Sequence, residues 1–321
     1  MISLILIGIL SGFFFSSTFF LNRLMSLEGG HWVWSASLRY AFMILFLILL
    51  LAVFQGIRTP RQVFRLFLKN WLFWTISGSI GFGAFYALIC FSADHAPGWI
   101  IAATWQLTII ASLVVLLGFG RSFPKKIWIF SIVIFVGILM VNLSHADLAN
   151  YKTLITGGLP VLVAAFCYPI GNQLVWEAQN GNKSLPDIKD PLLENPFNKV
   201  LLLSLGSVPF WLILVGTTRP APPSAQQILN TSLVALFSGI FATSLFLLAR
   251  NKSKKASELA AVDATQSSEV VFALIGEIIF LNAPLPNMMG FTGIFLVFIG
   301  LIFFIRFQEV ESEAQVSRDT E

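Results

Sequence analysis

Three charged side chains occur inside long apolar runs of this sequence, and they are the first candidates for chemistry. Arg39 lies in the run WVWSASLRYAFM, and Glu269 and Glu277 lie in the run DATQSSEVVFALIGEIIF. A charge at the centre of a membrane-spanning helix costs roughly 2.5–3.5 kcal/mol on insertion scales, so such residues are functional hypotheses by default. A carboxylate in a poorly hydrated cavity holds a proton near neutrality more readily than in water, and a cation can displace that proton. The alternative is a buried ion pair between Arg39 and one of these carboxylates, above all Glu277, that fixes helix register.

Polar residues around Glu269 share one face of the helix that this run predicts. At 100° per residue, Glu269, Gln266, Glu277, Asp263 and Ser267 fall on one arc of about 160°. Such a face must point at protein or at water rather than at lipid tails. We therefore expect it to line a cavity whose carboxylate binds a cation or a proton.

Other side chains within the apolar runs could bind or orient a ligand. Aromatic faces attract cations, and amides hydrogen-bond either to a ligand or to a neighbouring helix. Packing is the alternative for each ring, because the chain contains 32 Phe. The candidate substrate- or proton-binding residues are Glu269, Gln266, Trp105, Gln106, Arg39, Glu277, Tyr40, Asn172 and Tyr168.

The sequence lacks the signatures of common enzymes and metal sites. It contains no P-loop, no GxSxG and no HExxH motif, and His31, His95 and His145 lie far apart. We expect no enzymatic activity, no cofactor and no metal. The basic residues lie mostly in short connections between apolar runs, which argues against nucleic acid as a partner.

The elements that must position these residues are membrane-spanning helices. Hydrophobic residues make up 56% of the 321 residues and charged residues only 11%, against about 25% charged in a soluble chain. The apolar runs are continuous and about 20 residues long, which suits a spanning helix rather than the alternating strand of a barrel. The sequence predicts an all-α, polytopic membrane protein. The ten predicted spans are about residues 2–22, 32–54, 71–91, 99–119, 127–143, 155–176, 199–217, 232–250, 259–281 and 287–306.

The placement of Lys and Arg predicts the orientation. With the N-terminus inside, 16 of the 20 Lys and Arg residues fall in inside loops or in the tail and three fall outside. Short cytoplasmic loops retain positive charge, so both termini are expected in the cytoplasm. The polar loop 177–199 and the tail 307–321 then lie on the same side, and we expect the tail to be disordered.

The two halves of the chain are predicted to be inverted repeats. The segment STFFLNRL of the first span corresponds to YPIGNQLV of the sixth, and Gln106 corresponds to Gln266. Each half has five spans, an odd number, so the second copy is inverted, as in many secondary transporters. We expect residues 1–152 to form the first repeat and 153–306 the second, with the site between them near the midplane. Pro160 and Pro169 predict either a broken or a kinked sixth span.

The halves resemble the drug/metabolite transporter superfamily, over residues 1 to about 306. SLRYAF around Arg39 is similar to the superfamily's Arg motif in span 2, and IGEIIF is similar to its Gly-Glu motif in span 9. MMGFTGIFLVFIGLIFF is similar to its closing Gly-rich helix. YPIGNQLVWEAQN and the long middle loop look more like the multidrug resistance efflux branch than the metabolite-exporter branch. The superfamily's four-helix multidrug proteins use an embedded Glu in their first span, which this chain lacks, so Glu269 is the candidate for that role.

The resemblance implies secondary active transport of a small molecule. We expect export of a cationic or amphipathic compound across the cytoplasmic membrane, by proton antiport with alternating access. The expected partners are the substrate, protons and the lipid bilayer, and the protein is expected to act as a monomer or a homodimer. One alternative is an exporter of amino acids or other metabolites without proton coupling. Another is a non-transporting scaffold or sensor, whose interior would be dry, with Arg39 and the glutamates all paired.

Overall fold

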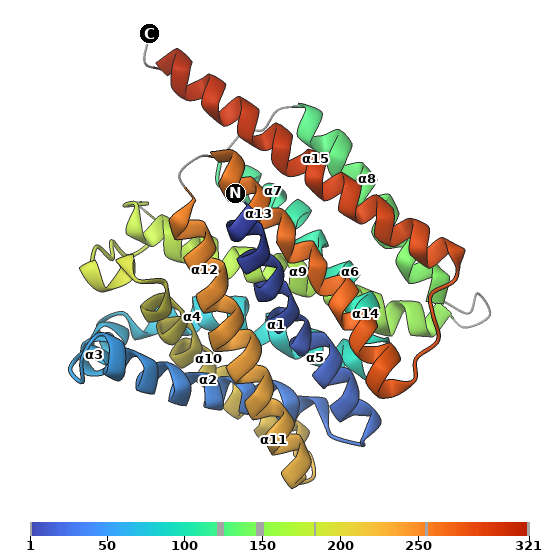
Figure 1. Cartoon of the computed structure of the whole chain (residues 1–321). Coiled ribbons are helices and arrows are strands. Elements are labelled where there is room, and N and C mark those ends of the chain that lie inside the picture. The colour runs from blue at the N-terminus through green and yellow to red at the C-terminus, as the bar shows by residue number, and fades with distance from the viewer. Residues whose placement is uncertain (1, 121–124, 146–150, 183, 254–255, 320–321) are drawn as a thin grey trace.

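The computed structural model describes residues 2–120, 125–145, 151–182, 184–253 and 256–319, and every regular element in these ranges is a helix (Figure 1). The α-helices of the first half are α1 (Ile2–Leu27), α2 (Trp32–Phe54), α3 (Thr59–Lys69), α4 (Trp71–Gly78), α5 (Phe85–Ala93), α6 (Gly98–Trp105), α7 (Leu107–Gly118) and α8 (Lys125–His145). Those of the second half are α9 (Tyr151–Gln179), α10 (Pro196–Thr218), α11 (Ala225–Val234), α12 (Thr243–Lys252), α13 (Ala256–Ala264), α14 (Ser268–Leu281) and α15 (Met288–Asp319).

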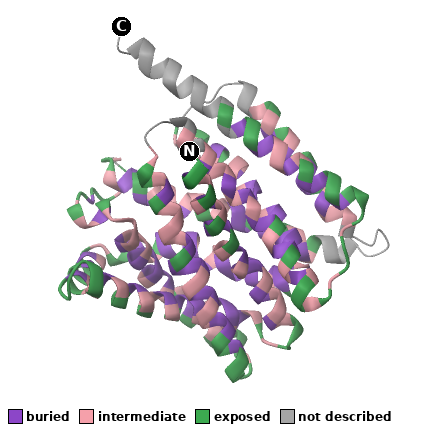
Figure 2. Cartoon of the chain, in the orientation of Figure 1, coloured by how far each residue is buried: buried purple, intermediate pink, exposed green. Residues whose placement is uncertain are grey.

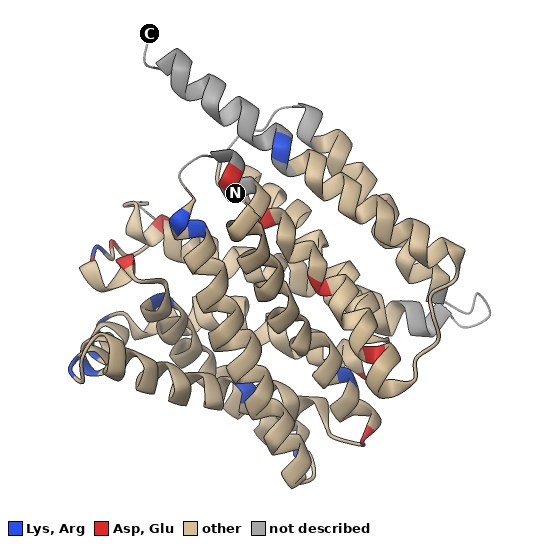
Figure 3. Ribbon diagram, viewed as in Figure 1, with Lys and Arg blue, Asp and Glu red and all other residues tan. Residues whose placement is uncertain are grey.

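The prediction of an all-helical polytopic membrane protein is confirmed for the described part of the chain. Eight helical stretches there are long and apolar enough to cross a membrane, and they coincide with eight of the ten predicted spans. The other two predicted spans correspond to shorter apolar stretches, Trp128–Ser144 within α8 and Met288–Phe304 within α15. Figure 3 shows that Lys and Arg concentrate near helix ends and that few charges lie within the bundle.

Four of the spanning stretches are interrupted within the bundle. A π-helical segment, η1 (Ser79–Ala84), joins α4 to α5, and another, η3 (Ala235–Ala242), joins α11 to α12. α6 and α7 are separated at Gln106, and a 3-10 turn, η4 (Thr265–Ser267), separates α13 from α14. Such insertions are frequent at functional sites, because they redirect side chains and free backbone groups.

The helix with two internal prolines is not one of the interrupted ones. α9 runs as a single helix from Tyr151 to Gln179 with Pro160 and Pro169 inside it, so the prediction of a broken sixth span is wrong. Each proline removes one backbone hydrogen bond, and the remaining turns are sufficient to keep the helix continuous.

α1 and α9 hold the bundle together in similar ways. α1 packs against η3 and α12 and also against α14, while α9 packs against η1 and α5 and also against α6 and α7. Figure 2 shows that buried positions gather in the middle of the bundle and exposed ones toward its periphery. α10 packs on α2 and α4. α8 and α15 pair along one edge (Figure 1), where Gly137 and Gly293 face each other's backbone and leave no room for a side chain.

The connections are more ordered than the sequence predicts. α3 was not anticipated; it is an amphipathic helix that buries Val63 and Leu66 and exposes its basic residues. In the loop 177–199, Ile188 is 3% and Leu193 is 0% exposed, so this polar loop is anchored on the bundle. The tail 307–321 was expected to be disordered, whereas α15 continues as a helix as far as Asp319, through a segment without Gly or Pro.

Candidate substrate site

Arg39, on α2, is a buried cation surrounded by aromatic rings. Only 9% of its surface is exposed. Its guanidinium carbon lies 3.9 Å from the centre of the Tyr86 ring and 5.5 Å from that of Tyr40, within the range of a cation–π interaction. One guanidinium nitrogen donates a hydrogen bond to Ser238 Oγ at 3.2 Å. The Nε atom is buried and has no acceptor among the described residues.

No carboxylate balances the charge of Arg39 within the described part of the chain. The ion pairs found there do not involve Arg39, so the pair with Glu277 that the sequence left open does not form. Rings and a hydroxyl stabilise a guanidinium less than a carboxylate does, and an unpaired buried charge is costly. Arg39 is therefore suited to receive a polar or anionic group from a ligand.

The rings around Arg39 come from several helices. Tyr40 stacks on Trp211 of α10 with 5.3 Å between ring centres, and it meets Tyr86 edge-on at 5.8 Å. The Tyr86 hydroxyl accepts a hydrogen bond from Asn22 of α1 at 3.0 Å. The cluster thus ties α1, α2, α5 and α10 together around a single positive charge.

A second group of rings adjoins the first. Phe85 is the first residue of α5, and the centre of its ring lies 5.8 Å from that of the Tyr86 ring. It also contacts Trp105, at 4.8 Å, and Tyr168, at 5.2 Å, and Trp105 and Tyr168 meet edge-on at 5.7 Å. Tyr168 is 36% exposed, which is unusual for a ring with so many aromatic neighbours. Arg39 and Glu269 both lie within electrostatic range of its hydroxyl.

The two predicted amides of this region bond within their own helices. Asn172 Nδ2 donates to the carbonyl oxygen of Tyr168 at 2.9 Å, and Gln106 Nε2 donates to that of Ala102 at 3.3 Å. Neither of these bonds joins two helices. Asn22, in contrast, links α1 to α5 through its bond to the Tyr86 hydroxyl.

Glu269 is a buried carboxylate in the first turn of α14, directly after the 3-10 turn η4. It is 6% exposed. None of the described residues forms an ion pair with it or donates a hydrogen bond to it in this structure. A carboxylate without a fixed partner in such a position can exchange a proton or receive a cation.

Polar atoms without partners gather at the interrupted helices. Gln266 Nε2, Ser268 Oγ and Thr108 Oγ1 are all buried and lack hydrogen-bond partners among the residues that the structure describes. Leaving such a group unsatisfied costs roughly 1–3 kcal/mol. Unsatisfied buried groups are uncommon in folded proteins, so these three atoms, close in sequence to Glu269 and Gln106, are candidates for bonding to a ligand or to water.

α1 closes this region through two glycines. A side chain at Gly8 would collide with Thr265, and one at Gly12 would collide with Ser268. The two glycines therefore let α1 approach the turn η4 and the start of α14 closely, as their spacing of four residues favours. The approach fixes the position of Glu269 relative to α1.

Glu277 lies apart from this constellation, near the end of α14. One of its carboxylate oxygens accepts a hydrogen bond from the backbone N–H of Gly98, at the start of α6. Arg23 of α1 is close enough to interact with it electrostatically, and Arg23 itself donates to the carbonyl oxygen of Ala93 at 2.7 Å. In this structure Glu277 thus caps α6 and links it to α14.

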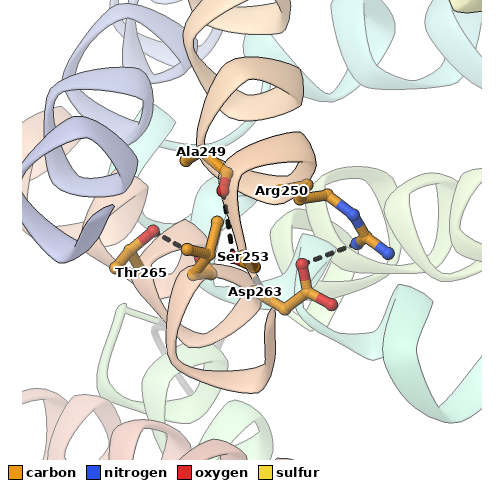
Figure 4. Close-up of polar contacts among 6 residues, drawn as sticks. Ala249, Arg250, Ser253, Asp263 and Thr265 are labelled. Atoms are coloured by element: carbon orange, nitrogen blue, oxygen red, sulfur yellow. Dashed lines mark hydrogen bonds and ion pairs between the residues drawn. The ribbon is translucent and has the colours of Figure 1, made fainter. Parts of the chain in front are cut away.

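Asp263 likewise has a structural partner. Figure 4 shows its carboxylate facing Arg250, with Arg250 Nη1 2.6 Å from Asp263 Oδ1. The pair joins α12 to α13 across their connection, and about one third of each side chain is exposed. This contact removes Asp263 from the candidates for the site.

The structure therefore brings Arg39, Tyr40, Trp105 and Tyr168 into one connected cluster, with Glu269 in electrostatic reach of Tyr168. Sequence reasoning omitted several members of the cluster from its candidates: Asn22, Phe85, Tyr86, Trp211 and Ser238. Asn22 and Tyr86 carried a usable signal, because polar groups inside spans are rare. Phe85 and Ser238 carried none, since Phe and Ser are common in this chain.

Comparison with known proteins identifies relatives along nearly the whole chain. Residues 2–310 match the family model described as "EmrE: Putative multidrug resistance efflux transporter". The chain is 38% identical over 314 residues to "Uncharacterized protein YjlA" of Bacillus subtilis (strain 168), a match that covers 93% of each chain. It is 35% identical over 277 residues to "Uncharacterized 42.1 kDa protein in intracellular alkaline protease 3'region" of Shouchella clausii, covering 82% of this chain and 69% of that one. With its apolar helices and a match over residues 2–310, the chain belongs to the EmrE family that this model describes, as the resemblance of its motifs predicted.

Proposed function

We propose that this membrane transporter exports small cationic or amphipathic compounds across the cell membrane in exchange for protons. The observation that carries the proposal is Glu269, a carboxylate with 6% exposure and no fixed partner within the described chain. Tyr168 and Trp105 supply aromatic faces nearby for a cation. Gln266 and Gln106, at the two helix interruptions, supply amides that can orient it.

The coupling follows from competition for a single carboxylate. A bound proton neutralises Glu269, and a bound cation requires the ionised form, so the site holds one or the other. If the site opens alternately to the two sides, each cation that leaves is exchanged for a proton that enters. In this proposal the substrate binds beside Tyr168, whose ring is 36% exposed.

Alternating access is proposed to arise from two inverted repeats, residues 1–152 and 153–306. The interruptions support this pairing, because π-helical segments occur in the third and eighth spans and breaks occur at Gln106 and Gln266 in the fourth and ninth. The packing supports it too. α1 against α14 is matched by α9 against α7, and α1 against η3 is matched by α9 against η1.

The proposed orientation places both termini and the loop 177–199 in the cytoplasm, from the distribution of Lys and Arg. Single cysteines at Ala221 and at Ile57 test it, after replacement of Cys90 and Cys167. Both residues are exposed and lie in connections between helices. An impermeant thiol reagent on intact cells is expected to label the cysteine at 221 and to spare the one at 57; the reverse pattern contradicts the orientation.

The transport proposal is tested in proteoliposomes with an imposed pH gradient and an internal pH dye. Lipophilic cations, guanidinium compounds and amino acids are added in turn. The wild type is expected to dissipate the gradient with cations, and Glu269→Gln is expected to fail. The matched control is Glu28→Gln, which removes an exposed carboxylate just after the end of α1 and keeps an oxygen that can accept from Asn230 Nδ2. Gradient dissipation by Glu269→Gln at the wild-type rate would contradict the role of Glu269.

A second candidate function has its own observation. Arg39 is a buried cation without a carboxylate partner in the described chain, and this favours a substrate that carries an anionic group, such as an amino acid. Counterflow of labelled amino acids that persists in Glu269→Gln and disappears in Arg39→Gln would favour this exporter without proton coupling. A non-transporting scaffold is less well supported, because it requires Arg39 and Glu269 to be paired.

A further inference from the structure

Two adjoining pockets lie at the end of the bundle that carries α3, away from the substrate site. One, of about 640 Å³, lies between α3 and the loop before α10. The other, of about 360 Å³, runs along α4 beside the loop residues Leu185 and Pro186. Lys69 lines both pockets, so a single elongated ligand can occupy them together.

The larger pocket is lined by equal numbers of positive and negative side chains. Arg65 and Lys69 of α3 line one wall, and Asp190 and Glu194 of the loop before α10 line the other. No ion pair links these four residues in the part of the chain that the structure describes. Opposite charges around one space that do not pair with each other leave room for a ligand that carries both signs.

The smaller pocket is an apolar groove with a polar rim. Its wall includes Leu72 and Ile76, which are 57% and 49% exposed, together with Leu174. Lys69 and Asn70 lie at one end of it. Its size and lining suit part of an acyl chain, whereas a water-soluble ligand would gain little from these walls.

Both pockets lie at the ends of apolar spanning stretches, one of which ends at Phe54 and the next of which begins at Trp71. Trp71 lines the groove and is 58% exposed, as tryptophans at such a boundary are. α3 is amphipathic, with Val63 and Leu66 buried, Phe64 48% exposed, and Arg61 exposed beside it. A short helix of this kind lies in the plane of the interface.

We propose that this double pocket binds a phospholipid with a phosphoethanolamine headgroup. The phosphate bonds to Arg65 and Lys69, and the ammonium group bonds to Asp190 and Glu194. One acyl chain lies in the groove along Ile76. A purely anionic headgroup would meet the two carboxylates unfavourably, and a quaternary choline could not donate hydrogen bonds to them.

The proposal is tested by native mass spectrometry of the detergent-solubilised full chain. Phosphatidylethanolamine, phosphatidylglycerol and phosphatidylcholine with identical acyl chains compete for binding. The wild type is expected to bind phosphatidylethanolamine about ten-fold more tightly than either other lipid, because charge-assisted hydrogen bonds are made at both ends of the headgroup. Equal binding of the three lipids, or a preference for phosphatidylglycerol, would overturn the assignment.

Variants locate the site on the protein. Lys69→Gln is expected to weaken phosphatidylethanolamine binding about ten-fold. The control is Arg61→Gln, which removes an exposed charge from the same helix and lines neither pocket. Asp190→Asn combined with Glu194→Gln keeps the acceptor that Asp190 offers to the N–H of Leu192 and is expected to shift the preference to phosphatidylglycerol. Circular dichroism confirms that each variant is folded. An equal loss in Arg61→Gln and Lys69→Gln would contradict the site.

Discussion

At the scale of the residue, Arg39 shows how a charge can be held inside a membrane protein without an ion pair. Its guanidinium carbon lies over the Tyr86 ring, 3.9 Å from the ring centre, and one guanidinium nitrogen donates to Ser238. The residue type matters as much as the charge, because a lysine presents a compact ammonium and cannot stack.

Arg39→Lys is therefore expected to destabilise the protein by about 1–2 kcal/mol, the range of a desolvated cation–π contact. The measurement is the thermal unfolding midpoint of the purified protein in one detergent. Arg58→Lys is the control, since Arg58 is exposed at the start of α3. A midpoint for Arg39→Lys equal to that of the wild type would mean that the stacking contributes nothing.

Two variants at Glu277 distinguish a helix-capping role of this side chain from a proton-binding role. Glu277→Gln keeps an oxygen that can accept from the Gly98 N–H, so proton-coupled transport is expected to survive. Glu277→Ala leaves that N–H unsatisfied and is expected to cost about 1–3 kcal/mol of stability. Comparing the two variants by thermal unfolding and by gradient dissipation tests this assignment. Loss of proton coupling in Glu277→Gln, with stability unchanged, would place the proton on Glu277.

At the scale of the element, the approach of α1 to η4 and α14 depends on Gly8 and Gly12. Gly12→Leu is expected to push α1 away from Ser268, with a cost of about 1–3 kcal/mol from overpacking. The transport rate is expected to fall together with the stability, because Glu269 directly follows Ser268 in the chain and would be displaced with it. Gly216→Leu is the matched control, since Gly216 has open space around it within α10. Transport by both leucine variants at the wild-type rate would show that this close packing does not position the site.

The sequence predicted the spans better than it predicted their interruptions. Continuous apolar runs identify a helix that crosses a membrane, whatever it packs against. The π-helical segments and the turn η4 depend on neighbouring helices, because an interruption forms where packing and hydrogen bonds elsewhere compensate for it. For the same reason Pro160 and Pro169 were misleading: proline weakens a helix locally, and the surroundings of α9 decide whether it breaks.

At the scale of the whole molecule, the arrangement of the helices decides which polar residues meet. The sequence identified Arg39, Glu269 and Glu277 as unusual, since each is a charge in an apolar run. It could not say that Arg39 meets tyrosines or that Glu277 meets the start of α6, because these contacts join distant parts of the chain. α3 escaped prediction because its 11 residues alternate basic and apolar positions too briefly to stand out.

The central claim is that a proton and a cation compete for Glu269, and proton release on binding tests it most directly. The probe is tetraphenylphosphonium, a lipophilic cation that has no proton of its own to release. Isothermal titration calorimetry of the purified full chain, in two buffers that differ in ionisation enthalpy, counts the protons released. The account predicts about one proton per cation at pH values where Glu269 is protonated, none in Glu269→Gln, and the wild-type number in Glu28→Gln. Cation binding by the wild type across the pH range with no proton released, or equal release by Glu269→Gln, would contradict it.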